Sequence, residues 1–121
     1  MKTLKLFSSI FTMFLALVLL VGCNISQSYA DKINKAAENN EHFTSKEVIE
    51  KLGEENCIKG LIAGNGAVIA IKGIEDLDQL KEDLKNGKTV KGIVVVFVFD
   101  KATSAHYGEI TEEDLSLLKW F

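Results

Sequence analysis

Hydrophobic residues follow three spacings along this chain: one long continuous run, several helical stripes and two strand-like blocks. The continuous run covers residues 6–21, is interrupted by three polar side chains and follows a start that carries Lys2 and Lys5. A basic start followed by an apolar segment of this length is typical of an export signal. A buried helix and a membrane-spanning anchor are the alternatives, but the uninterrupted part is short for a span and no basic stop-transfer cluster follows it.

Helical spacing returns in the later part of the chain. The clearest segment has Thr44 and Glu47 at capping-box spacing and Gly53 as a left-handed stop, which together predict a short helix between them. An amphipathic stripe and a second capping box, from Thr111 to Asp114, predict two more helices, and an Ala-, Lys- and Glu-rich stretch predicts a weak first one. The helices are expected at residues 28–40, 45–52, 74–86 and after Thr111.

Strand-like spacing occurs on both sides of Asn65-Gly66, a dipeptide preferred in two-residue hairpin turns. The later run from Ile93 to Phe99 is too rich in β-branched residues for a helix, and its near-continuity predicts a central strand buried on both faces. We therefore expect Val96, Phe97, Val98 and Phe99 all to be buried. The strands are expected at 57–63, 67–72, 93–99 and 103–107, with a turn at Asp100-Lys101.

These elements predict an α+β fold, in which short helices pack on one face of a small, mainly antiparallel four-stranded sheet. The chain has 121 residues, enough for one domain. We expect residues 1–22 to be a signal peptide, residues 23–30 a modified cysteine with its tether, and residues 31–121 a single domain.

The charge balance argues against nucleic-acid binding. All 14 basic residues are lysines, and from Cys23 onward 12 lysines face 17 acidic residues, a net charge of −5. A mildly acidic domain without arginine lacks both the field and the bidentate donors that favour phosphate.

No residue pattern in the chain indicates catalysis, a metal or a cofactor, so we expect a protein that is not an enzyme. His42 and His106 are the two histidines, and structural zinc needs about four ligands. Apart from Cys23 the only cysteine is Cys57, which begins an apolar run beside acids that raise a thiol pKa. A core cysteine is the simplest interpretation; an intermolecular partner, a reactive thiol and a dyad with His106 are the alternatives.

The junction Leu20-Val21-Gly22-Cys23 resembles the bacterial lipobox. This resemblance implies cleavage between Gly22 and Cys23, a diacylglyceryl group on the Cys23 sulfur, and further acylation such as palmitate. Two or three acyl chains anchor a protein stably, whereas one chain does so marginally. The expected location is the extracytoplasmic face of the cell membrane, with the protein held there by the lipid on Cys23.

Two stretches, "FTSKEVIEKLG" and "VVVFVFDKATSAHY", resemble the small lipoprotein domains of the BLIP-like group, which includes the outer-membrane lipoprotein SmpA. The first resembles a capped helix ending in Leu-Gly, and the second resembles paired strands with an aromatic-Asp turn. The resemblance implies helices on one face of an antiparallel sheet whose exposed face binds protein.

The expected function is therefore a lipid-anchored, non-enzymatic protein-binding module of the cell envelope, with an envelope protein as partner. The alternative is an inhibitor or exclusion lipoprotein that acts on a foreign enzyme or a phage protein. The candidate partner contacts are aromatic: Tyr107 at a strand end, and Trp120 and Phe121 at the C-terminus if they do not fold back on the sheet.

The lipobox predicts that lipid attachment depends on the Cys23 sulfur. Replacing Cys23 with serine removes the sulfur that would accept the lipid, so Cys23→Ser should leave the precursor uncleaved and release most of it from lipid-dependent membrane association. Metabolic labelling with a radioactive fatty acid checks this. Absence of label on the wild-type protein, or equal label on the serine variant, would contradict it.

Overall fold

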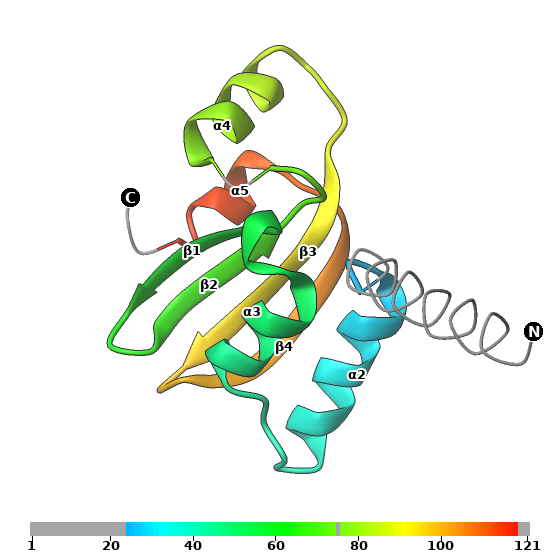
Figure 1. Cartoon of the computed structure of the whole chain (residues 1–121), viewed down its shortest axis with the longest axis vertical. Coiled ribbons are helices and arrows are strands. Elements are labelled where there is room, and N and C mark those ends of the chain that lie inside the picture. The colour runs from blue at the N-terminus through cyan, green and yellow to red at the C-terminus, as the bar shows by residue number, and fades with distance from the viewer. Residues whose placement is uncertain (1–23, 75, 119–121) are drawn as a thin grey trace, which may run out of the picture.

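Four antiparallel strands, placed side by side in the order β1-β2-β3-β4, form the sheet at the centre of the domain (Figure 1). The computed structural model describes residues 24–74 and 76–118. The predicted α+β class is confirmed. The elements are α2 (Gln27–Glu38), α3 (Ser45–Leu52), the 3-10 turn η1 (Glu54–Asn56), β1 (Cys57–Ile62), β2 (Asn65–Ala70), α4 (Leu77–Lys85), β3 (Lys91–Val98), β4 (Lys101–Glu109) and α5 (Glu112–Leu115).

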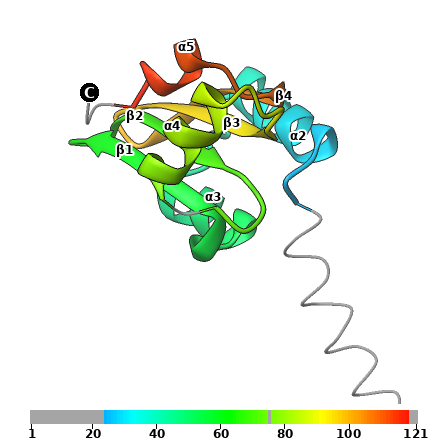
Figure 2. The ribbon, with the colours of Figure 1, turned by 90° about the horizontal axis from the view of Figure 1, so that it is seen from above.

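Helices cover both faces of the sheet, and not one face as the sequence analysis expected. On one face, residues of α2 and α3 share a hydrophobic cluster with Val68 and Val95. On the other face, Leu80 of α4 and Leu115 of α5 share a second cluster with Ile69. Figure 2 shows α3 and α5 on opposite sides of the sheet. Neighbouring residues of β2 and β3 are apolar and point to opposite faces, so each face needs its own cover.

The helix caps explain where α3 and α5 begin. The Thr44 hydroxyl accepts a hydrogen bond from the Glu47 backbone N–H at 3.2 Å, and α3 spans the predicted residues. At α5 the Asp114 carboxylate accepts from the Thr111 N–H at 2.8 Å, which completes the predicted capping box. The predicted helix 74–86 is shorter in the structure, because Asp76 caps the start of α4.

The domain begins earlier than residue 31. Ser26 caps α2, and Tyr29 and Ala30 are buried in the core. The Asn24 side chain donates a hydrogen bond to the Lys51 carbonyl, at the end of α3, at 3.0 Å. The described part of the expected tether is therefore folded against the domain.

Both hairpin turns lie earlier along the chain than predicted. The β1–β2 turn is Ala63-Gly64, not Asn65-Gly66, and the β3–β4 turn is Phe99-Asp100, not Asp100-Lys101. All four turn residues have positive φ, between 50° and 78°, as type I′ turns require. Contacts between the two turns decide their positions, as described below.

The expected burial of the whole run 96–99 is wrong beyond Phe97. Phe97 is 1% exposed and Val96 is half-buried, but Val98 is 45% exposed and Phe99 is 76% exposed. β3 ends at Val98, so Phe99 belongs to the turn and has no strand on either side. The inner part of β3 is central and buried on both faces, and its end is not.

This contrast supplies a matched test of the core. Phe97→Ala removes a fully buried ring, which typically costs about 3–5 kcal/mol of a domain stability of about 5–15 kcal/mol. Phe99→Ala removes the same atoms from an exposed site and should change stability little. Thermal melts of the full chain in detergent check this, and similar midpoints for the two variants would contradict the placement of Phe97.

Candidate functional site

The two hairpin turns lie against each other and are held by backbone hydrogen bonds. The Asp100 N–H donates to the Gly64 carbonyl at 2.9 Å, and the Phe99 N–H donates to the Asn65 side-chain oxygen at 3.0 Å. A Cβ at residue 64 would lie 2.6 Å from the Asp100 nitrogen, so only glycine allows this approach. Because Asn65 is needed as an acceptor for Phe99, it begins β2 and does not occupy the turn.

Asp100 also joins this end of the sheet to α3. Its carboxylate accepts a hydrogen bond from the Ser45 backbone N–H at 3.2 Å and another from the Ser45 hydroxyl. The first residue of α3 is thereby tied to the β3–β4 turn. The hairpin ends are thus fixed in position by hydrogen bonds.

The large hydrophobic side chains that are exposed in residues 24–74 and 76–118 gather at this end of the molecule. Ile62 is 61% exposed and is the last residue of β1, Val98 is the last residue of β3, and Phe99 follows it. Leu117, just after α5, is 40% exposed. We call these four residues, Ile62, Val98, Phe99 and Leu117, the hairpin-end patch.

A hollow of about 380 Å³ lies beside the patch and is lined by two of its residues, Val98 and Leu117. Asn65, Gly66 and the end of β3 form one wall, and Ser116 and Leu117 form the other. Its volume lies in the lower part of the range for small-ligand pockets and suits one or two side chains of a partner.

Residues 24–74 and 76–118 leave the patch without cover because α5 is short. α5 has four residues, and the chain after it crosses the sheet at Gly60, where a Cβ would lie 2.6 Å from the Leu118 Cβ. Leu118 therefore packs directly on the β1 backbone and is 1% exposed. Beyond this crossing, the α5 side of the sheet has no helix over Ile62 and Val98 among the described residues.

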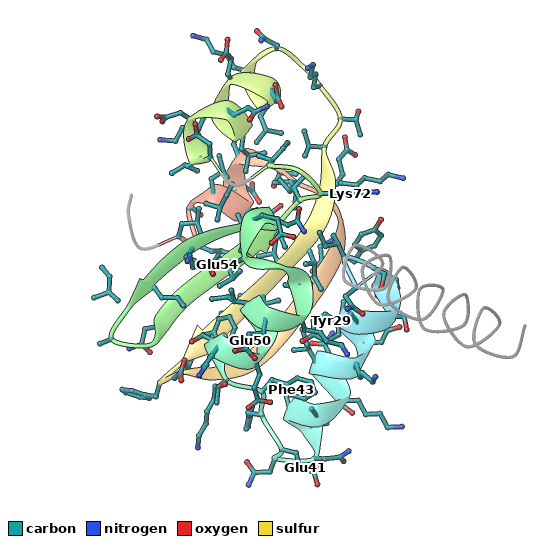
Figure 3. All side chains as sticks on the ribbon, in the orientation of Figure 1. Tyr29, Glu41, Phe43, Glu50, Glu54 and Lys72 are labelled. Atoms are coloured by element: carbon teal, nitrogen blue, oxygen red, sulfur yellow. The ribbon has the colours of Figure 1, made fainter. Side chains whose placement is uncertain are left out.

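A second hollow, of about 330 Å³, lies between α2 and α3 and is lined by Tyr29, Lys32, Phe43, Glu47 and Lys51. The Tyr29 and Phe43 rings stack with centroids 6.4 Å apart, and Figure 3 shows both in this region. Burial, and then the charge of Glu47, raise the pKa of the Tyr29 hydroxyl to about 12. The phenol therefore stays neutral at pH 7 and is no general base, and the two rings serve mainly to pack the helices together.

The cysteine–histidine dyad considered in the sequence analysis does not form. Cys57 lies on β1 in the α2–α3 cluster, whereas His106 lies on β4 opposite Val94, which belongs to the other cluster. The two residues are on opposite faces and on opposite edges, about 14 Å apart by strand spacing alone. His42 lies with Nδ1 2.9 Å from the Ala102 carbonyl, so this nitrogen donates and holds the loop before α3 against β4.

Asn56 is a buried polar residue that the sequence analysis did not single out. Its amide donates to the Leu52 carbonyl at 3.1 Å and accepts from the Gly73 N–H at 2.8 Å. It therefore connects the end of α3 to the segment after β2, a structural task. Within the described parts of the chain, no group of three or more acidic, histidine or cysteine side chains is placed to hold a metal ion.

Of the predicted site residues, Gly22, Cys23, Trp120 and Phe121 lie outside the described residues. Tyr107 is half-buried and packs against the α2–α3 cluster. The sequence analysis did not select the hairpin-end patch. The one available signal was that the apolar run continues through Phe99 and stops only at Asp100.

Among the described residues, no helix is long and apolar enough to cross a membrane. Comparison of the chain with protein-family models, with curated proteins and with solved structures finds no match.

The burial of Cys57 generates a prediction about thiol reactivity. Burial is the largest cause that raises the pKa of the Cys57 thiol to about 12; the charge of Lys59 lowers the pKa, and the charges of Glu55 and Glu54 raise it. In the full-length Cys23→Ser chain, where Cys57 is the only thiol, a disulfide reagent at pH 8 should label the folded protein far more slowly than the protein in denaturant. Fast labelling of the folded protein would contradict this.

The raised pKa of Cys57 also determines how its contribution to the stability of the fold changes with pH. A group whose pKa is raised on folding stabilises the fold fully below its unfolded pKa, about 8.5 for a thiol, and that contribution is lost as pH rises toward its folded pKa. The contributions of Cys57 and Tyr29 should therefore be intact at pH 7 and decline toward pH 12.

Proposed function

We propose that this protein is a lipid-anchored, non-enzymatic protein-binding module at the extracytoplasmic face of the cell membrane. In this proposal Cys23 carries the lipid and the hairpin-end patch contacts an envelope protein. The resemblance to the BLIP-like group supports a binding role, although that resemblance implies helices on one face and this domain has them on both.

The observation that carries the proposal is Phe99. A large aromatic side chain that is 76% exposed leaves much apolar surface in water. The residue also has φ of 50°, in the left-handed region that favours glycine and asparagine. The stability of the fold favours neither the exposed ring nor the positive φ. Both are explained if the ring serves as a binding anchor.

The surroundings of Phe99 fit a protein partner. Val98 and Leu117 line the adjacent hollow, which can accept a side chain of the partner, and Ile62 is exposed at the end of β1. Interfaces concentrate their binding energy in a few such aromatic and aliphatic anchors near a pocket. The polar bonds that hold the turns in place mean that little order has to be gained on binding.

The position of Asn24, the first described residue, favours a protein partner for the patch over insertion of the patch into the bilayer. Figure 1 shows the start of α2 on one side of the molecule and both hairpin turns on the other. The hydrogen bond from Asn24 to Lys51 holds the residue next to Cys23 against the domain. A lipid on Cys23 would then lie away from the patch, and the patch would be free to meet a protein.

The test uses two glycine substitutions at left-handed residues. Phe99→Gly removes the ring and relieves the backbone, so it should raise or preserve the melting temperature while abolishing partner capture. Ala63→Gly relieves the neighbouring turn in the same way but keeps the ring, so it should retain the partner. The measurement is co-purification of the full chain from detergent-solubilised membranes, with thermal melts of each variant.

The outcomes separate the alternatives. A constant envelope protein that is lost only with Phe99→Gly supports the proposal. A captured phage protein or foreign enzyme would instead place the protein in the inhibitor class. Equal capture by Phe99→Gly and the wild type would exclude the hairpin-end patch as the contact.

A further inference from the structure

The two edges of the sheet differ in whether their backbone groups are already bonded. At the β4 edge, the Ala102 N–H donates to the Phe43 carbonyl at 2.8 Å, and the Ala102 carbonyl accepts from His42. The Asn34 side chain pairs with both the N–H and the carbonyl of Ala105, at 2.9 and 2.8 Å. Edges that are covered in this way cannot add another strand.

The β1 edge has no such cover. The two-residue turn makes Ile62 and Asn65 a hydrogen-bonded pair, and the pattern alternates along the ladder, so the backbone groups of Lys59 and Leu61 point away from β2. The Cys57 N–H is bonded to Glu54, but in residues 24–74 and 76–118 no hydrogen bond to another element is found for the N–H or carbonyl of Lys59 and Leu61. Unpaired groups at alternate residues are the template for another strand.

We propose that the β1 edge binds an extended segment of the partner protein as a fifth strand. This inference rests on the proposed function and adds how the partner is held. The added strand would continue the sheet beside Ile62, so backbone pairing at the edge and apolar contact at the hairpin-end patch would belong to one surface.

The charges around β1 define the side chains that such a segment needs. Three exposed acids, Glu50, Glu54 and Glu55, lie on α3 and η1, the two elements that precede β1, and the Lys59 side chain bonds to Glu54 at 3.2 Å. Figure 3 shows Glu50 and Glu54 on the side where α3 covers the sheet. On the other face the edge meets Ile62 and Leu118. Since side chains of a strand alternate between faces, the segment should alternate basic and apolar residues.

The same charges disfavour a second copy of this chain. Two β1 strands paired antiparallel keep the same face of each sheet together, so the acids of both copies would lie on the same face of the joined sheet. A register centred on Lys59 would also place Lys59 opposite Lys59 of the other copy. Like charges directly opposite each other are destabilising.

The experiment uses a seven-residue probe peptide of alternating lysine and valine, added to the full chain in neutral detergent. Backbone pairing predicts that hydrogen exchange slows at the Lys59 and Leu61 amides, while exchange at Ala102 and Ala105 on the covered edge stays unchanged. A control peptide with glutamate in place of lysine should bind at least tenfold more weakly. Binding without slower exchange at Lys59 and Leu61 would overturn the proposal.

A matched pair of variants tests the backbone contribution. Lys59→Pro removes the outward N–H at an edge position that donates no hydrogen bond to β2, whereas Lys59→Ala removes the same charge and keeps the N–H. We expect the alanine variant to bind the probe like the wild type and the proline variant to bind at least tenfold more weakly. Equal binding of the two variants would overturn the proposal, and the exchange measurement on the wild type decides it should the proline variant not fold.

Two further outcomes separate this inference from the function on which it rests. Retention of the membrane partner by Lys59→Pro, together with its loss in Phe99→Gly, would overturn strand addition and leave the patch as the binding site. Slower exchange at Lys59 that appears without peptide, as protein concentration rises, would show a second copy at the edge and also overturn the proposal.

Discussion

The burial of β2 and β3 on both faces is the constraint on which the rest of the structure depends. Consecutive apolar residues such as Val68 and Ile69 belong to different hydrophobic clusters, so the sheet is stable only with helices on each side. About 95 residues then have to supply two layers of cover, and the helices are short. α2 and α3 cover one face, whereas α4 and α5 leave the hairpin end of the other face open. The hairpin-end patch is the part of this face that the described residues do not cover.

The polar contacts at the sheet are distributed just as unevenly. The side chains of Asn34 and His42, both outside the sheet, bond to the β4 edge, and Asp100 joins both hairpin turns to α3. The β1 edge receives no equivalent contact among the described residues, although it is next to the uncovered face. Rigidity at one edge and unpaired backbone at the other give the domain one side on which an extended chain can be added.

The elements that the sequence predicts most accurately are those whose first and last residues are set by neighbouring side chains. The helix from Ser45 to Leu52 was predicted to the residue because Thr44 and Gly53 act on the backbone next to them.

The positions of the turns could not be predicted in this way. Asn65-Gly66 is the better turn dipeptide, but Asn65 is required by the Phe99 amide and Gly64 by the close approach of Asp100, two contacts between segments about 35 residues apart. The exposure of Val98 depends on where the chain after α5 crosses the sheet, and the exposure of Phe99 depends on its place in the turn beyond β3. The role of Cys23 as an anchor remains a prediction from its lipobox.

The order of the strands also affects how the chain folds. Each strand pairs with its neighbour along the sequence, two of the three pairings are closed by two-residue turns, and the third encloses α4. Such pairings need little loop closure, which favours rapid formation of each hairpin. α2 differs, because Asn34 bonds to Ala105, 71 residues away. During synthesis α2 must therefore wait for β4, and its apolar face stays without its native partner until most of the chain has been made.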